Sequence, residues 1–128
     1  MKQRLFADVD DLAERMDELA VEQWEHPELG LHEERASRLL RDALSEAGFE
    51  IEAGVGDMPT AFVASYEAGT GPTIGILGEY DALPGLSQAV SAEREPIKAG
   101  GPGHGCGHNL FGVGSLAGAI AVKRAIER

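Results

Sequence analysis

The segment "TIGILGE", residues 73–79, is almost continuously apolar, and it decides the predicted fold. A short apolar run of this kind is typical of a β-strand that is covered on both faces, as in the sheets of α/β proteins. Such folds bind their ligands at the ends of strands. The residues at and after Glu79 are therefore the first place to look for a functional site.

Periodic patterns place the other elements around this strand. The segments "FEIEA" (49–53) and "AFVASY" (61–66) read as half-buried strands. Amphipathic patterns predict one helix from the N-terminus to about Trp24, a second over 33–47, and a buried third over about 110–128. We therefore expect an α/β fold, with a mixed β-sheet flanked by helices on both faces.

Regular periodicity is absent from Tyr80 to His108, where prolines and glycines are frequent. A long irregular stretch inside a compact domain is usually functional or disordered. It overlaps "GEYDALPG" (78–85), in which Glu79 and Asp81 are two residues apart and share one side of an extended chain. Two solvated acids at a strand end are the simpler interpretation. The functional interpretation is that one of them orients a metal-binding histidine.

The segment "GPGHGCGHNL" (101–110) contains the only cysteine of the chain. The glycine between Cys106 and His108 allows both side chains to reach one point, and a thiolate with an imidazole suits zinc. If the last helix begins at Asn109 or just after it, its dipole favours the thiolate, and Asn109 is suited to cap it. A glycine turn with an idle cysteine, and a thiol nucleophile with His108 as its base, are the alternatives.

Composition limits the classes of partner. The 128 residues suffice for one domain, and 22 acidic against 11 basic side chains give a formal charge of −11. Such a surface repels nucleic acids and anionic membranes, so we expect neither as a partner. A single cysteine excludes an internal disulfide and favours a cytoplasmic location.

Three segments in fixed order carry a family resemblance. The stretches "PELGLHEERASRLLRDALSEAGFEIE" (27–52), "GEYDALPGLSQ" (78–88) and "GHGCGHNL" (103–110) resemble the zinc-dependent aminoacylases and carboxypeptidases of peptidase family M-twenty. The nearest type is the amidohydrolases that act on aminobenzoyl-glutamate and related N-acyl amino acids. The resemblance implies hydrolysis of the amide of a small N-acyl amino acid or peptide at a centre of two divalent metal ions. We expect the metal to be zinc, or alternatively manganese, and the full-length protein to be a homodimer or larger oligomer.

The resemblance also implies roles for individual residues. Cys106 would bind or bridge the metals, and His108 would bind one of them. Asp81 would lie behind the metals as a catalytic residue that tunes the site. Glu79 stands where many relatives have a metal-binding histidine, and His104 matches no ligand of the family. The residues expected around the metal ligands, with no metal bond of their own, are Glu79, His104 and Asn109.

On this interpretation residues 1–128 are the N-terminal part of a catalytic metallohydrolase domain. The family's dimerisation domain, its further histidine ligands and its glutamate base would lie in a C-terminal part that this sequence does not include. We expect the complete amidohydrolase to be active and the 128 residues alone to be inactive. The alternative is a non-catalytic truncated copy that binds a metal or a partner.

Overall fold

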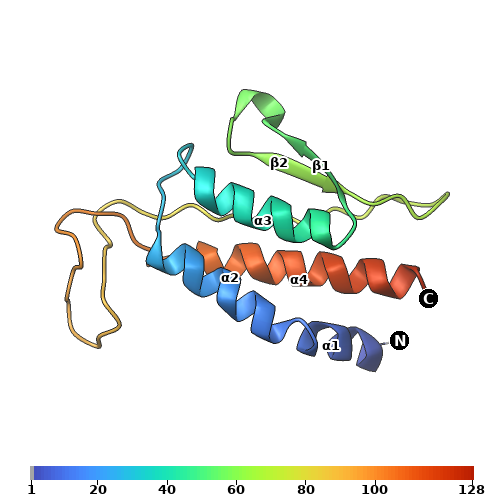
Figure 1. Ribbon diagram of the computed structural model, residues 1–128, viewed down its shortest axis with the longest axis horizontal. Helices are drawn as coiled ribbons and strands as arrows, with labels where there is room; N and C mark the ends of the chain where they lie inside the picture. The colour runs from blue at the N-terminus through green and yellow to red at the C-terminus, as the bar shows by residue number, and fades with distance from the viewer. Residues whose placement is uncertain (1) are drawn as a thin grey trace.

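The computed structural model describes residues 2–128 and arranges the chain in layers (Figure 1). In the view of Figure 1 the sheet lies above α3, α3 above α4, and α1 and α2 lie along the lower side of α4. Helices flanking a small sheet confirm the predicted α/β class. The elements are α1 (Lys2–Asp10), α2 (Ala13–Glu25), α3 (Glu34–Glu46), β1 (Glu50–Ala53), the short 3₁₀ helix η1 (Val55–Asp57), β2 (Phe62–Ser65) and α4 (His108–Ile126).

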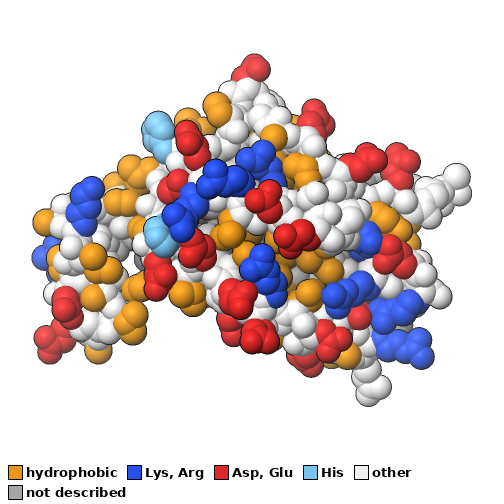
Figure 2. Space-filling view, viewed as in Figure 1, with side chains coloured by type: hydrophobic (Ala, Val, Ile, Leu, Met, Phe, Trp, Pro, Cys, Tyr) orange, Lys and Arg blue, Asp and Glu red, His pale blue; other side chains and the backbone are white. Residues whose placement is uncertain are grey.

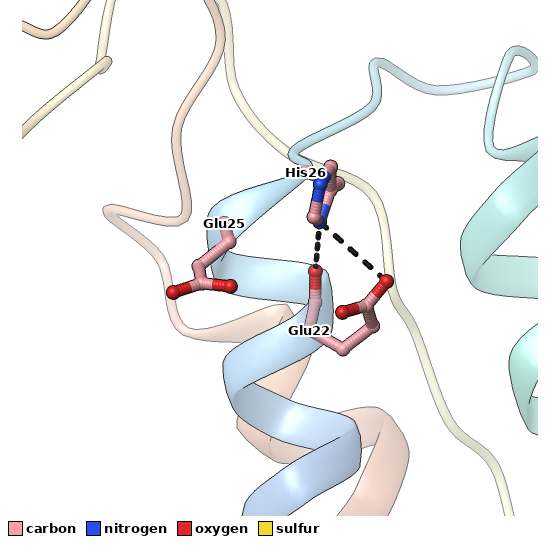
Figure 3. A group of neighbouring side chains, drawn as sticks. All are labelled: Glu22, Glu25 and His26. Carbon is pink, nitrogen blue, oxygen red and sulfur yellow. Dashed lines mark hydrogen bonds and ion pairs between the residues drawn. The ribbon is translucent and has the colours of Figure 1, made fainter.

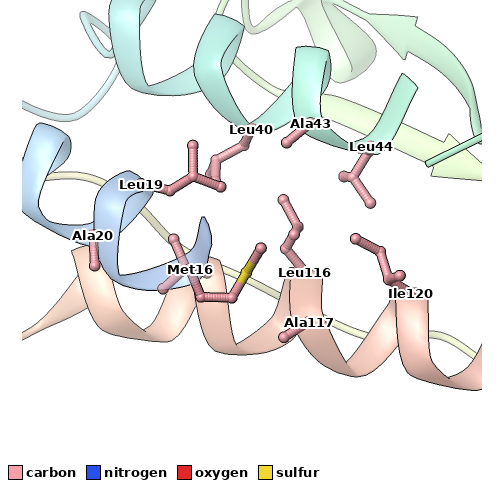
Figure 4. Close-up of a cluster of buried hydrophobic side chains, with 10 residues drawn as sticks. Met16, Leu19, Ala20, Leu40, Ala43, Leu44, Leu116, Ala117 and Ile120 are labelled. Carbon is pink, nitrogen blue, oxygen red and sulfur yellow. The ribbon is translucent and has the colours of Figure 1, made fainter. Parts of the chain in front are cut away.

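The hydrophobic core forms where α2, α3 and α4 meet, and Figure 4 shows side chains of all three helices pointing toward one another. Leu19 and Leu40 are only 1% and 2% exposed. The predicted last helix is present, but Leu110 and Phe111 at its start are exposed, so it is buried on one face and not all round. The core residues are Met16, Leu19, Ala20, Leu40, Ala43, Leu44, Val113, Leu116, Ala117 and Ile120.

Helix α3 agrees with the helix predicted over 33–47, and both of its ends have a local cause. At its start, the Glu28 carboxylate accepts hydrogen bonds from the backbone N–H groups of Arg35 (3.1 Å) and Ala36 (2.9 Å). These are N–H groups of the first turn, which have no partner within a helix. At its end, Gly48 adopts a left-handed conformation with φ of +84°, which stops the helix.

The prediction of one continuous helix at the N-terminus is wrong, because the chain breaks after Asp10. The backbone N–H of Leu12 bonds to the carbonyl of Val9 at 3.0 Å, three residues back, which makes a tighter turn than an α-helix. After this turn α2 begins. The break lets α1 lie against the end of α4, where Asp8 forms an ion pair with Arg128.

Two of the three predicted strands are present. Strands β1 and β2 pair antiparallel, with Ile51 opposite Ala64, and α3 packs against both of them. The sheet formed by the described residues has these two strands, so it is antiparallel and not the mixed sheet that the sequence predicted.

The prediction of a buried strand over 73–79 is wrong, although this segment carries the main sequence signal. No strand among residues 2–128 pairs with it, and a strand forms only where a neighbour completes its hydrogen bonds. The segment runs extended beside α4, where the Ser115 hydroxyl donates to the carbonyl of Leu77 at 2.5 Å. Ile74 and Leu77 are 69% and 85% exposed.

The stretch that follows has no helix or strand before α4 within the described residues, as predicted. Isolated bridges join Leu29 to Ala82 and Leu83 to Gly103.

Acidic and basic side chains are interspersed over the face in Figure 2. Within residues 2–128, no helix combines the length and the apolar character that crossing a bilayer demands.

Two glycines of α4 allow a matched test of this packing. A Cβ at Gly112 would lie 2.9 Å from the carbonyl oxygen of Glu79, whereas a Cβ at Gly118 meets nothing within 4 Å. We expect Gly112→Ala to destabilise the protein by about 1–3 kcal/mol through this clash. Gly118→Ala should stabilise it by about 0.5–1 kcal/mol, because alanine favours a helix. Urea unfolding of both variants measures the difference, and equal stabilisation by the two would contradict the close approach of α4 to Glu79.

Candidate metal centre

His108 is the first residue of α4, and the glycine before it sets its direction. Gly107 is the N-cap, with φ of +85°, a left-handed conformation that side-chain-bearing residues rarely adopt. The prediction that Asn109 caps the helix is therefore wrong, because the helix begins one residue earlier. This start brings His108 to the end of the 73–79 segment.

The imidazole of His108 lies between two carboxylates. Its Nδ1 is 2.8 Å from Oδ1 of Asp81, and its Nε2 is 2.9 Å from Oε2 of Glu79. A carboxylate only accepts, so each of these contacts is a hydrogen bond when the ring nitrogen that it faces carries a proton. The three side chains offer one ligand atom each within 4.8 Å of one another, an arrangement that could hold a metal ion. The His108 side chain is 20% exposed and that of Glu79 is 58% exposed, so this group opens to solvent.

Cys106 is exposed and lies outside this group of three residues. It sits on the turn that leads into α4, where the backbone N–H of Gly107 bonds to the carbonyl of His104 at 3.3 Å. The described residues contain two groups of three potential ligands, and neither includes the thiol. Cys106 therefore does not belong to the group that contains His108, and its pairing with His108 stays a prediction.

His104 is partly buried beside the group, and its Nδ1 has no hydrogen-bond partner among the described residues. Burial lowers the pKa of His104 below the usual histidine value, and the nearby His108 acts in the same direction. The neutral form of the ring is thereby favoured. His104 does not belong to the group of potential ligands.

Asn109 joins the start of α4 to α2. The side chain is 5% exposed, and its Nδ2 donates to the carbonyl of Ala20 at 3.1 Å. Because Ala20 is 89 residues away, no local pattern predicts this bond. Asn109 thus fixes the first turn of α4, on which His108 lies.

Sequence reasoning missed the polar contacts behind Asp81. The Tyr80 hydroxyl donates to the carbonyl of Thr60 at 2.5 Å, and the Thr60 hydroxyl donates to Oε2 of Glu33 at 2.6 Å. Burial raises the pKa of Tyr80, so its hydroxyl remains a donor over the ordinary pH range. Thr60 and Glu33 are 6% and 8% exposed. Thr60 stands in no motif, and Glu33 lies in the 27–52 segment with no role of its own assigned, so the sequence does not signal their contact.

A second group of potential ligands, formed by Glu22, Glu25 and His26, lies at the end of α2 (Figure 3). His26 Nδ1 is 3.0 Å from the backbone carbonyl of Glu22, a contact that serves the last turn of the helix. The Arg35 guanidinium donates to Glu22 and lowers the pKa of that carboxyl. The end of α2 and the Glu22–Arg35 ion pair therefore explain why these side chains lie together.

Comparison with known proteins places this geometry in a family context. No family model matches the chain. Over 131 aligned positions the chain is 44% identical to a p-aminobenzoyl-glutamate hydrolase subunit of Escherichia coli, covering 98% of this chain and 27% of that protein. It is 32% identical to the Xaa-Arg dipeptidase of Mus musculus, over 99% of this chain and 28% of that one. Thermostable carboxypeptidase 2 of Saccharolobus solfataricus is also 32% identical, over 89% of this chain and 31% of its own length.

A solved structure shares the fold. An aminohydrolase from methicillin-resistant Staphylococcus aureus superposes with a TM-score of 0.82 at 25% sequence identity, over 99% of this chain and 32% of that one. The chain therefore spans about a quarter to a third of the length of the relatives it matches. Over that span, its homologues are named p-aminobenzoyl-glutamate hydrolase, Xaa-Arg dipeptidase and thermostable carboxypeptidase, in agreement with the resemblance that its motifs carry.

Proposed function

We propose that the chain is the N-terminal part of the catalytic domain of a metal-dependent amidohydrolase. The observation that carries this proposal is the His108 imidazole held between Asp81 and Glu79 at the start of α4. A carboxylate on one ring nitrogen of a histidine is the arrangement that directs the other nitrogen to a metal. The relatives named hydrolase, dipeptidase and carboxypeptidase support the reaction class.

The donor atoms of this group suit a divalent metal. Nε2 of His108 and the Glu79 carboxylate are nitrogen and oxygen donors of the kind that zinc and manganese accept. In this assignment Glu79 binds the metal directly, whereas the resemblance alone placed it near the ligands without a metal bond of its own. Cys106 would join through a rearrangement of its glycine-rich turn, and its thiolate favours zinc over manganese.

When bound, the metal would activate water and polarise the scissile carbonyl. The residues of this chain would hold the metal and orient the His108 ring toward it. Asp81 accepts the Nδ1 proton of His108 and so leaves Nε2 available to the metal. The general base and the remaining ligands of a two-metal centre are assigned to no residue of this chain.

The names of the relatives guide the proposed substrate. Aminobenzoyl-glutamate and dipeptides both present an amide beside a free carboxylate, so we assign the complete amidohydrolase to small N-acyl amino acids or peptides. Release of aminobenzoate from aminobenzoyl-glutamate by that complete protein, with zinc added, tests this assignment. The homo-oligomeric state and the cytoplasmic location stay predictions.

Metal content distinguishes the proposed ligands. We expect His108→Ala to lose most of the bound zinc, because it removes the central ligand, and Cys106→Ala to reduce zinc content. His26→Ala is the matched control, since His26 belongs to the other group of potential ligands. Zinc per chain after dialysis, measured by mass spectrometry, checks this. Loss of zinc in His26→Ala with full zinc in His108→Ala would place the metal at the end of α2 instead. Equal zinc in wild type and Cys106→Ala would remove the thiol from the centre.

Asp81→Asn separates orientation from binding. In the complete amidohydrolase we expect turnover to fall by about 10–100-fold while most of the metal remains bound, because Asn lacks the charge that holds the Nδ1 proton. The exposed Asp42→Asn serves as control. Turnover and zinc content are measured on the same samples. Unchanged turnover would exclude the orienting role, and complete loss of zinc would make Asp81 a direct ligand.

A further inference from the structure

The position of Asp81 needs an explanation, because the chain that precedes it has no sheet to hold it. Residues 73–79 pair with no strand within the described part of the chain, and Leu77 is 85% exposed. Two residues after this segment, the Asp81 carboxylate is nevertheless 2.8 Å from Nδ1 of His108. The contacts that fix Asp81 must therefore come from its immediate neighbours.

Both neighbours of Asp81 are anchored, and both anchors lead to the start of α3. On one side, the Tyr80 hydroxyl bonds to the Thr60 carbonyl at 2.5 Å, and the Tyr80 ring stacks on Phe62 at 6.0 Å between centroids. On the other side, the backbone N–H of Ala82 donates to the carbonyl of Glu28 at 2.7 Å. Asp81 is thus held between two fixed points.

Thr60 is in turn held by Glu33, the residue before α3. The Thr60 hydroxyl donates to Glu33 Oε2 at 2.6 Å, and both residues are buried. Glu33 makes no cap to its own helix, a task that the Glu28 carboxylate performs. Burying a carboxylate is unfavourable unless it is paired or hydrogen-bonded. The buried Glu33 carboxylate therefore adds little to the stability of the fold, but its hydrogen bond fixes the position of Thr60.

Loop 28–33 also lies directly against the carboxylate that it helps to place. A Cβ added at Gly30 would be 4.0 Å from Oδ2 of Asp81 and 3.9 Å from Oε1 of Glu33. Both carboxylates therefore lie close to Gly30. The approach of Gly30 to Asp81 is independent of the hydrogen bonds through Thr60.

We propose that Glu33, Thr60 and Tyr80 form a positioning chain that holds the Asp81 carboxylate on Nδ1 of His108. The inference rests on the proposed function for its purpose, since it orients His108 for a metal, but the contact itself exists without one. None of these three residues belongs to the group of potential metal ligands. Its members act through Asp81.

Tyr80→Phe tests the chain by removing one oxygen and leaving the ring on Phe62. In the metal-free, ¹⁵N-labelled protein, wild type should show a protected Nδ1-bound proton of His108, identified by its loss in His108→Ala. We expect Tyr80→Phe to lose or broaden this resonance, because Asp81 no longer shields the proton from exchange. Tyr66→Phe is the matched control, since Tyr66 is the other tyrosine and its hydroxyl bonds to Glu127.

Thr60 offers a second pair of variants that differ in the hydroxyl. Thr60→Val should lose the His108 proton resonance, and Thr60→Ser should restore it. A double-mutant cycle on zinc affinity tests the same point. Tyr80→Phe should weaken zinc binding by about tenfold in the wild-type background and have no further effect in the Asp81→Asn background. A wild-type His108 resonance in folded Tyr80→Phe overturns the proposal. An equal loss of zinc affinity in both backgrounds also overturns it, since the effect would then not pass through Asp81.

The two proposals fail separately. If no variant binds zinc, wild type included, but Tyr80→Phe still loses the Nδ1 proton, the positioning chain stands and the metal function falls. If zinc binds through His108 and the resonance survives in Tyr80→Phe, the metal function stands and the positioning chain falls. Circular dichroism of each variant establishes that it is folded.

Discussion

The packing of α4 between α2 and α3 is the contact on which both the core and the candidate metal centre depend. One face of α4 supplies apolar side chains to the core, and its first residue is His108. One turn further along, Gly112 leaves room for the carbonyl of Glu79. Asn109 ties the same turn to α2. The helix thus positions the histidine and one carboxylate of the site through the packing that closes the core.

The fold is predictable where the signal is local. The apolar periodicity of α3 and the glycine at 48 both lie within residues 33–48, so this segment alone predicts the helix and its end. The break at Leu12 carries no glycine or proline, and it is explained by the contact of α1 with the far end of the chain. The strand predicted over 73–79 fails for a related reason. An apolar run indicates that a segment can be buried, but the partner that would bury it lies elsewhere in the sequence or outside it.

The site divides in the same way. Glu79, Asp81 and His108 can be found because spacing and motif order place them, and the structure brings the three together. The contacts behind them cannot be read, because Thr60 and Glu33 are 27 residues apart and Tyr80 is another 20 residues on. Nothing in a threonine or tyrosine marks it as a hydrogen-bonding partner of a distant turn. Burial alone makes these contacts consequential, since an unsatisfied polar group costs most where water is excluded.

The contact of Asp8 with Arg128 joins residues 120 positions apart, so it forms only after the whole segment between them has been synthesised. The core requires Leu19 of α2 and Leu116 of α4 together, so a chain leaving the ribosome cannot complete it until α4 has emerged. Until then, α2 has α3 to pack against, and α3 has α2 and the two strands. Contacts between partners this far apart in the sequence require long loops to close, which slows folding. The excess of negative charge then has a use during synthesis, because like-charged chains with incomplete cores repel one another.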